Sequence, residues 1–136
     1  PLMGRFWRAN RGDRAEFGTP APRLGLVTAG KAYGDLMQAL RLLGIDATRA
    51  RALGLDVYKV GMIWPLEPEG LREFAHACEE LFFVEEKSAF MEPQAAALFY
   101  NDARRPRIFG KTGEDGEESS DRVHAHSSGQ RAALVR

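Results

Sequence analysis

Residues 57–87 read VYKVGMIWPLEPEGLREFAHACEELFFVEEK, and this stretch decides the fold. Two short apolar runs, residues 57–60 and 81–84, are typical of buried strands, and the segment between them carries apolar residues at helical spacing. A helix between two such strands predicts a βαβ unit with parallel strands and a right-handed crossover. Both strands then end at one edge of the sheet, where α/β proteins place their functional groups.

The helix of this unit has a clear start and a clear buried side. Pro68 suits the first helical position, and Glu69 favours the positive end of the helix dipole. Four apolar residues then recur at i, i+3, i+4 and i+7, which predicts one buried stripe. The residues of this stripe are Leu71, Phe74, Ala75 and Cys78. Because Cys78 lies on the stripe, we expect a thiol packed in the core.

The chain before this unit predicts one more strand and two helices. Residues 24–28 form a short apolar run, as expected of a buried parallel strand. The helix that follows should end at Gly44, and Asp46 should cap a short helix over residues 47–53 that Gly54 closes. The first of these helices also carries an apolar stripe at helical spacing. Its residues are Leu36, Ala39, Leu40 and Leu43.

Beyond residue 87 we expect a helix from near Pro93 to Tyr100 and a strand over residues 107–109. The whole pattern predicts a three-layer α/β/α sandwich on a mainly parallel sheet of four or five strands. The single domain is expected over residues 23–111.

The two ends of the chain have a different composition. Residues 1–22 are rich in Arg, Gly and Pro, which predicts a linker or an arm lying on a neighbour. Residues 112–136 are acidic and poor in apolar side chains, which predicts a disordered tail. The start at Pro1 suggests a segment of a longer protein.

Charge and composition exclude several classes of partner. Lys+Arg and Asp+Glu both number 19, so the net charge is +0 and nothing favours binding to nucleic acid or to an anionic membrane. The sequence has no apolar run long enough to span a bilayer. Its single cysteine excludes an internal disulfide and a Cys-rich cluster site on this chain, and fits the reducing cytoplasm.

Three motifs suggest sites but fail on spacing. Gly110-Lys111-Thr112 resembles the end of a phosphate-binding P-loop, but Arg105 stands where that motif needs glycine. His124 and His126 have no second pair of metal ligands beside them. His76 and Cys78 point to different sides of one helix and cannot bind the same ion. We therefore predict no catalytic, cofactor-binding or metal-binding residue on this chain.

The remaining candidates are the side chains that follow each predicted strand. In a parallel sheet these converge on one edge, where they could perform acid–base chemistry or contact a neighbouring domain. The candidate domain-interface residues are Thr28, Lys31, Trp64, Glu85, Glu86, Lys87 and Lys111. Adjacent residues leave a strand in opposite directions, so Glu85 and Glu86 do not form a catalytic pair. Trp64 is either an interface anchor or a core residue.

Four stretches of the chain together resemble one enzyme family. They are LVTAGKAY at 26–33, AL and LGID at 39–40 and 43–46, LDVYKVGMIWPLEP at 55–68, and VEEK at 84–87. This pattern resembles the indolepyruvate ferredoxin oxidoreductases, members of the thiamine-diphosphate-dependent 2-oxoacid:ferredoxin oxidoreductases, over residues 23–111. It is also similar to the C-terminal domain of transketolases. After Lys111 the Ser-, His- and Glu-rich tail departs from the family, whose members continue with a more hydrophobic stretch.

The resemblance implies a parent enzyme that oxidatively decarboxylates aryl pyruvates, such as indolepyruvate, to acyl-CoA and reduces ferredoxin. Thiamine diphosphate, Mg and iron–sulfur clusters would perform that chemistry elsewhere in the parent. None of the family's cofactor-binding residues falls on this chain. The implied role is a non-catalytic organising domain whose partners are other domains or subunits of the parent, which itself uses CoA and ferredoxin. The isolated chain is expected to be inactive.

Two alternatives stay open. The chain could be a free-standing α/β module that binds a small anion at the strand ends. It could also be the homologous domain of a dehydrogenase β subunit. The string WPLEP at 64–68 argues against this second alternative, because that class resembles the string mainly through its Pro-Leu pair.

Overall fold

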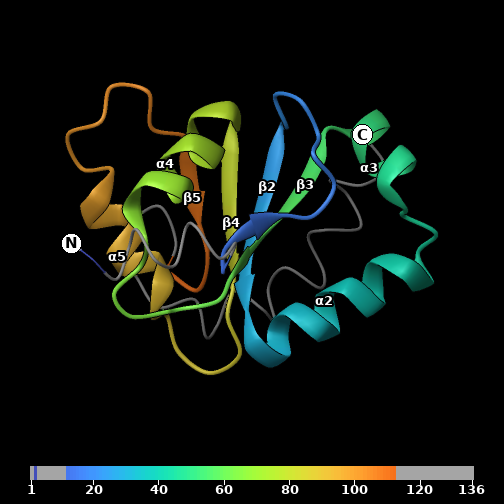
Figure 1. Cartoon of the computed structure of the whole chain (residues 1–136), viewed down its shortest axis with the longest axis horizontal. Coiled ribbons are helices and arrows are strands. Elements are labelled where there is room, and N and C mark those ends of the chain that lie inside the picture. Colours follow the sequence, from blue (N-terminus) through green and yellow to red (C-terminus); the bar gives the residue numbers. More distant parts are fainter. Residues whose placement is uncertain (1, 3–11, 113–136) are drawn as a thin grey trace.

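The computed structural model describes residues 12–112 together with Leu2, and five strands in this part form one sheet. The strand order is β1-β3-β2-β4-β5, in which β1 runs antiparallel to β3 and the other neighbours are parallel. Helices cover both faces, so the predicted three-layer sandwich on a mainly parallel sheet is confirmed (Figure 1). The elements are β1 (Arg14–Ala15), β2 (Leu24–Ala29), α2 (Gly30–Leu42), α3 (Ala47–Leu53), β3 (Leu55–Val60), α4 (Pro68–Ala77), β4 (Glu80–Val84), α5 (Met91–Leu98) and β5 (Arg107–Phe109).

The face of the sheet under α4 and α5 holds the larger core. The four predicted stripe residues of α4 are all buried there, with Cys78 among them, and the Phe74 ring stacks on Tyr58 at 4.9 Å between centroids. β2 approaches α4 closely because residue 25 is glycine. A Cβ at Gly25 would lie 2.6 Å from Phe74 Cε1 and 2.8 Å from Cys78 Sγ. The buried stripe of α4 was therefore predicted correctly.

The opposite face is covered by α2 and α3, and here the predicted stripe of α2 is half right, because Leu36 and Leu40 pack towards the sheet but Ala39 and Leu43 do not. Ala39 is exposed and Leu43 lies past the helix end with 74% of its surface exposed, whereas Leu40 is buried. The residues that pack towards the sheet are Tyr33, Leu36, Met37 and Leu40. This set has the same helical spacing as the predicted one, so periodicity alone does not choose between them. The side of α2 that packs against the sheet also carries Tyr33, whose hydroxyl lies 2.9 Å from Glu16.

The helix ends confirm most of the expected capping residues. The Asp46 carboxylate accepts a hydrogen bond from the Arg49 amide at 2.8 Å, and Gly54 closes α3 in the left-handed conformation with φ 72°. α5 begins at Met91 and ends at Leu98, so both of its ends lie about two residues before the predicted ones near Pro93 and Tyr100. Its early start is due to a side chain from another element, Glu85.

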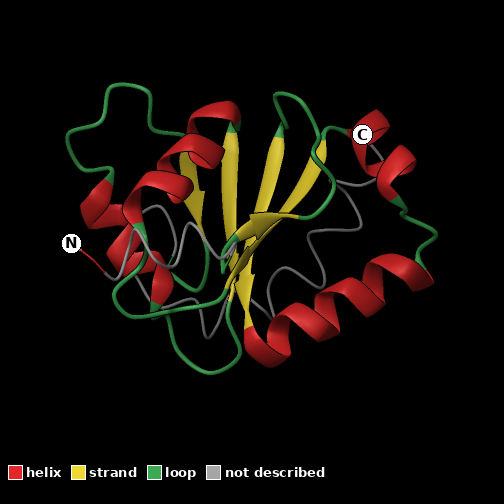
Figure 2. Ribbon diagram, viewed as in Figure 1, coloured by secondary structure: helices red, strands yellow, loops and turns green. Residues whose placement is uncertain are grey.

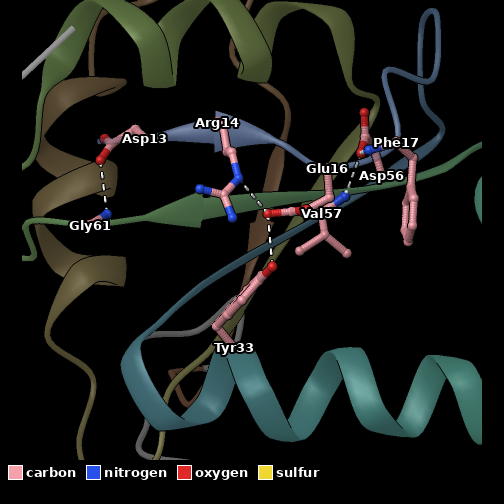
Figure 3. Close-up of polar contacts among 8 residues, drawn as sticks. All are labelled: Asp13, Arg14, Glu16, Phe17, Tyr33, Asp56, Val57 and Gly61. Atoms are coloured by element: carbon pink, nitrogen blue, oxygen red, sulfur yellow. Dashed lines mark hydrogen bonds and ion pairs between the residues drawn. The ribbon is translucent and has the colours of Figure 1, made fainter. Parts of the chain in front are cut away.

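Residues 13–19, which we call the N-terminal strap, belong to the folded unit. They fall in the stretch expected to be a linker or arm on a neighbour, but β1 pairs with β3 of the same domain. The Asp56 carboxylate, 1% exposed, accepts hydrogen bonds from the amides of Phe17 at 2.9 Å, Thr19 at 3.0 Å and Val57 at 2.8 Å. Figure 3 shows the strap lying along β3. Two paired residues are too few for an alternating pattern, so the sequence gives no strand signal here.

None of the helices in the described part is long and apolar enough to cross a membrane. The predicted disordered tail, apart from Thr112, and the histidine pair at His124 and His126 lie outside the described residues.

Candidate functional site

The carboxyl ends of β2, β3 and β4 lie at one edge of the sheet, as the βαβ pattern predicted. Ala29 pairs with Val60 and Thr28 with Val84, so the three strands end almost level. The start of α2 and the loops at 61–67 and 85–90 meet at this carboxyl edge, on the lower side of the sheet in Figure 2. Most candidate interface residues belong to these loops.

Glu85 is occupied by the fold itself. Its Oε1 accepts hydrogen bonds from the Phe90 amide at 2.9 Å and the Met91 amide at 2.6 Å, and its Oε2 from the Glu92 amide at 3.3 Å. The carboxylate therefore satisfies the free amides at the start of α5 and sits at the positive end of its dipole. This explains why α5 begins before Pro93. Glu85 is therefore a structural cap of α5.

Thr28 is also an internal residue. Its side chain is fully buried, and its hydroxyl donates to the Val84 carbonyl at 3.1 Å, which joins β2 to β4. A residue with no exposed surface cannot contact a neighbouring domain directly.

Lys31, Glu86 and Lys87 stay on the surface. The Lys31 ammonium lies 3.6 Å from Glu86 and 3.8 Å from Asp35, and these three side chains are at least half exposed. Glu86 thus turns towards α2 whereas Glu85 turns towards α5, in agreement with the opposite directions expected for neighbours on a strand. Exposed ion pairs of this kind contribute little to the stability of the fold. The charged groups of Lys31, Asp35 and Glu86 can therefore still contact other molecules.

Trp64 lies on the surface, and the alternative of a core residue does not hold. It is 66% exposed, and Ile63 and Phe90 beside it are 44% and 46% exposed. The rings of Trp64 and Phe90 lie 5.9 Å apart between centroids with a tilt of 58°. We call Ile63, Trp64 and Phe90 the aromatic patch. It joins the loop after β3 to the loop after β4.

Gln94 of α5 holds the two loops of the aromatic patch together. Its Nε2 donates to the Ile63 carbonyl at 2.7 Å and the Phe90 carbonyl at 3.0 Å, and its Oε1 accepts from the Leu66 amide at 3.2 Å. One side chain therefore fixes both loops through their backbones. Sequence reasoning missed Gln94, because its role depends on two loops that are remote in sequence.

Lys111 follows β5 in a loop that packs on α5. A Cβ at Gly110 would lie only 2.2 Å from Glu92 Oε2, so a larger residue at this position would have to displace the buried Glu92 carboxylate. Glu92 also accepts a hydrogen bond from the Thr112 amide at 3.2 Å. The Gly-Lys-Thr sequence is thus explained by packing against an acidic side chain, an unfavourable setting for a phosphate.

A second polar region lies at the other edge of the sheet, where β5 begins. His76 Nε2 lies 2.6 Å from Asp102 Oδ2, and the hydrogen bond from His76 lowers the pKa of that carboxyl. An open hollow of about 380 Å³ lies beside this pair, lined by Arg72, Leu98, Asn101, Asp102 and Ala103. The His76–Asp102 pair ties α4 to the loop between α5 and β5, which is a structural role.

The comparisons with known proteins identify related domains. A family model described as "Indolepyruvate oxidoreductase domain" matches residues 14–128. A search of curated proteins gives no match.

Two of the solved structures that match show the fold. A 2-oxoglutarate:ferredoxin oxidoreductase from Magnetococcus marinus, with 2-oxoglutarate, coenzyme A and succinyl-CoA bound, has a TM-score of 0.51 at 17% identity, and the match covers 80% of this chain and 19% of that one. A split-gene transketolase, an inactive beta4 tetramer, has a TM-score of 0.53 at 18% identity, covering 71% of this chain and 32% of that one. The chain therefore spans about a fifth to a third of the length of these proteins.

Proposed function

Because the chain belongs to the indolepyruvate oxidoreductase domain family, we propose that it is a non-catalytic organising domain of a cytoplasmic indolepyruvate:ferredoxin oxidoreductase. The parent enzyme would oxidatively decarboxylate aryl pyruvates to acyl-CoA and pass the electrons to ferredoxin. The partners of this domain would be the other domains or subunits of the parent, which also binds CoA and ferredoxin.

We place the thiamine diphosphate, the Mg and the iron–sulfur clusters of the parent on its other parts, because the described residues of this chain offer no ligand set for a cluster or a metal ion. A cluster needs several thiolates, but Cys78 is the single cysteine, its thiol donates to the Phe74 carbonyl at 3.3 Å, and burial raises its pKa to about 12. Among residues 12–112, no group of three or more His, Cys, Asp or Glu side chains could hold a metal ion. No chemical step is therefore assigned to this chain.

The observation that carries this proposal is the aromatic patch at the carboxyl edge. At that edge Glu85 and Thr28 hold the fold together, while Trp64, Phe90 and Ile63 stand in solvent on loops fixed by Gln94. Large aromatic side chains on a rigid exposed surface are typical of protein interfaces, where they contribute most of the binding energy. An edge built in this way supports assembly better than acid–base catalysis.

The test uses the assembled parent enzyme with its charged edge residues neutralised. We expect the Lys31→Met, Glu86→Gln and Lys87→Met triple variant to keep kcat within about threefold, because these groups touch no reacting atom, whereas loss of a general acid or base lowers rates about 10²- to 10⁴-fold. A loss of that size with the assembly intact would contradict the proposal. So would acyl-CoA formation by the isolated chain supplied with indolepyruvate, cofactors, CoA and ferredoxin.

The alternative of a free-standing anion-binding module is tested by calorimetry with phosphate, thiamine diphosphate and CoA. The Lys31 ammonium already lies near two carboxylates, Glu86 and Asp35, which weakens its attraction for an anion. An organising domain is expected to bind none of the three tightly. Tight binding by the isolated chain would favour the alternative.

A further inference from the structure

The two faces of the sheet are covered to different extents. On the face under α4 and α5, Tyr58, Val27 and Phe83 are buried side by side on three neighbouring strands, and the core continues to Ile108 of β5. On the other face, the described strand residues that pack with α2 and α3 belong to β2 and β3. In Figure 1, α2 and α3 lie on the β3 side of the sheet, away from β5. The second helical layer thus stops at β2.

One row of residues across the sheet shows where this cover ends. The strands are parallel and in register, so the row Val57, Leu26, Phe82 and Phe109 lies on one face. Val57 is fully buried and Leu26 packs with it, whereas Phe82 is 41% exposed and Phe109 is half-buried. Neither phenylalanine packs in a core cluster of the described residues, and nor does Val84, two residues after Phe82 on the same face. We call Phe82, Val84 and Phe109 the open strip.

The two ends of the open strip carry charges that are already paired. At the start of β4, Arg107 lies 3.4 Å from Glu80, and its guanidinium carbon lies 5.1 Å from the centre of the Phe109 ring. Just after the end of β4, Glu86 lies 3.6 Å from Lys31. An aromatic centre between such ends has the apolar middle and polar rim of a protein interface. Because the charges are paired, the strip suits an apolar partner better than a charged one.

The dimensions of the open strip fit a single helix. Neighbouring strands lie about 4.8 Å apart, so β4 and β5 together are about 10 Å wide, close to the diameter of an α-helix. The five residues of β4 extend about 17 Å, the length of about eleven helical residues. This area of about 170 Å² is far below the roughly 800 Å² that each partner of a stable dimer buries. The strip is therefore too small for a second copy, but it suffices for a segment that the parent already holds nearby.

We propose that a helix from another part of the parent enzyme packs on the open strip and completes the second helical layer of this domain. The contacting side of that helix would be a stripe of aliphatic residues that covers Phe82 and Phe109. This inference rests on the proposed function, because it names a second surface through which the domain meets its parent. The open strip shares no residue with the aromatic patch.

Hydroxyl-radical footprinting tests the proposal without any substitution, because an exposed aromatic ring is oxidised faster than a covered one. The 136-residue chain is compared with the assembled parent, and the oxidation of each residue is read by mass spectrometry of peptides. We expect oxidation of Phe82 and Phe109 to be at least about threefold slower in the parent, because a packed helix excludes water from both rings. Phe83 is the matched control, since it follows Phe82 in β4 but is 1% exposed on the other face and should react slowly in both samples.

The kind of partner is tested with a photoreactive phenylalanine analogue placed at residue 82 of the parent. Crosslinks are expected on one segment, at residues three or four apart, which is the spacing of one side of a helix. Crosslinks to a loop, or to alternate residues of a strand, would overturn the proposal. The same analogue at residue 109 should reach the same segment, so the result does not depend on one position.

Equal oxidation of Phe82 in the chain and in the parent would overturn the proposal. Slow oxidation in the isolated chain at every concentration would overturn it in favour of a cover from the chain itself, and protection that rises with concentration would overturn it in favour of a second copy. Trp64 of the aromatic patch separates this inference from the proposed function. If the parent protects Trp64 but not Phe82, the docked helix is ruled out and the organising role stands, since that role fails instead on the kcat of the charge variants.

Discussion

The N-terminal strap is polar in sequence but partly buried, whereas the aromatic patch is apolar in sequence but exposed. The strap comes from a polar, Gly- and Arg-rich stretch, yet Phe17 and Thr19 are buried and their amides bind the buried Asp56. The patch takes Ile63 and Trp64 from the apolar loop after β3 and Phe90 from the loop after β4, yet Trp64 is 66% exposed. Hydrogen bonds to the Asp56 carboxylate hold the strap, whereas hydrogen bonds between Gln94 and backbone groups hold the two loops of the patch. Composition alone therefore predicts neither region.

The largest loss of stability is expected when the carboxylate that holds the strap, Asp56, is removed. Asp56→Ala removes the acceptor of three backbone amides at a site that is 1% exposed, and we expect the free energy of unfolding to fall by about 3–4 kcal/mol, because buried donors are left unsatisfied. Chemical denaturation measures the change. Asp46→Ala, which removes an exposed cap, is the matched control and should cost about 1 kcal/mol. Equal losses in the two variants would show that the strap contributes nothing beyond an ordinary cap.

The support of the patch is tested at Gln94. Gln94→Ala loses two donated hydrogen bonds and one accepted one, so we expect a loss of about 1–2 kcal/mol and faster hydrogen exchange at the Leu66 amide. Gln94→Glu keeps the acceptor for Leu66 but loses the donors to Ile63 and Phe90. Exchange at Leu66 should therefore stay slow in Gln94→Glu. Fast exchange in both variants would mean that the donors alone fix the loops.

A smaller effect is expected where the strap meets α2. The Tyr33 hydroxyl donates to Glu16 Oε1 at 2.9 Å, and burial, followed by the contact with Glu16, raises the pKa of Tyr33 above 10.0. A raised pKa means that the folded state favours the neutral phenol. This contribution to stability is present below pH 10.0 and is lost as the pH rises through the pKa of the folded state.

Tyr33→Phe should therefore remove part of the alkaline loss of stability and cost about 0.5–1.5 kcal/mol at neutral pH. Denaturant midpoints measured from neutral to alkaline pH report both effects. An alkaline slope that is identical in the two proteins would assign that loss to other groups.

The smallest effect on stability is expected at the patch itself. Trp64→Ser should change the free energy of unfolding of the chain by no more than about 0.5 kcal/mol, because the side chain is mostly in solvent. Phe83→Ala, at 1% exposure, provides an aromatic control that should cost about 3–5 kcal/mol. Thermal unfolding compares the two. A large loss in Trp64→Ser would mean that the patch is part of the core of this domain.

The sequence predicted what depends on local spacing and missed what depends on remote contacts. The α4 stripe was correct because Pro68, Glu69 and the apolar residues leave one arrangement, whereas α2 offers two stripes of equal spacing and packs on the one that contains Tyr33. The strands from β2 to β5 were found, but β1 was missed because it has only two residues.

The structure places most of the candidate residues at the edge of the sheet where the sequence predicted them, but the contacts of their side chains were not predicted. Glu85 looked like a surface acid, and only the position of α5 shows that it caps that helix. Gln94 carries no sequence signal at all, since its three partners lie in the two loops of the patch. Roles of this kind are set by tertiary packing.

The strap also covers the outer side of β3. Along the outer side of β3, Asp13 binds the Gly61 amide, β1 pairs with Lys59 and Tyr58, the Glu16 amide donates to the Val57 carbonyl, and the Thr19 hydroxyl donates to the Leu55 carbonyl. Without these contacts β3 would be an apolar edge strand, which is a template for pairing with other molecules. A chain cut at residue 23, the expected start of the domain, would expose that edge along its whole length. The strap thus occupies the backbone groups of β3 that an edge strand would offer to other molecules.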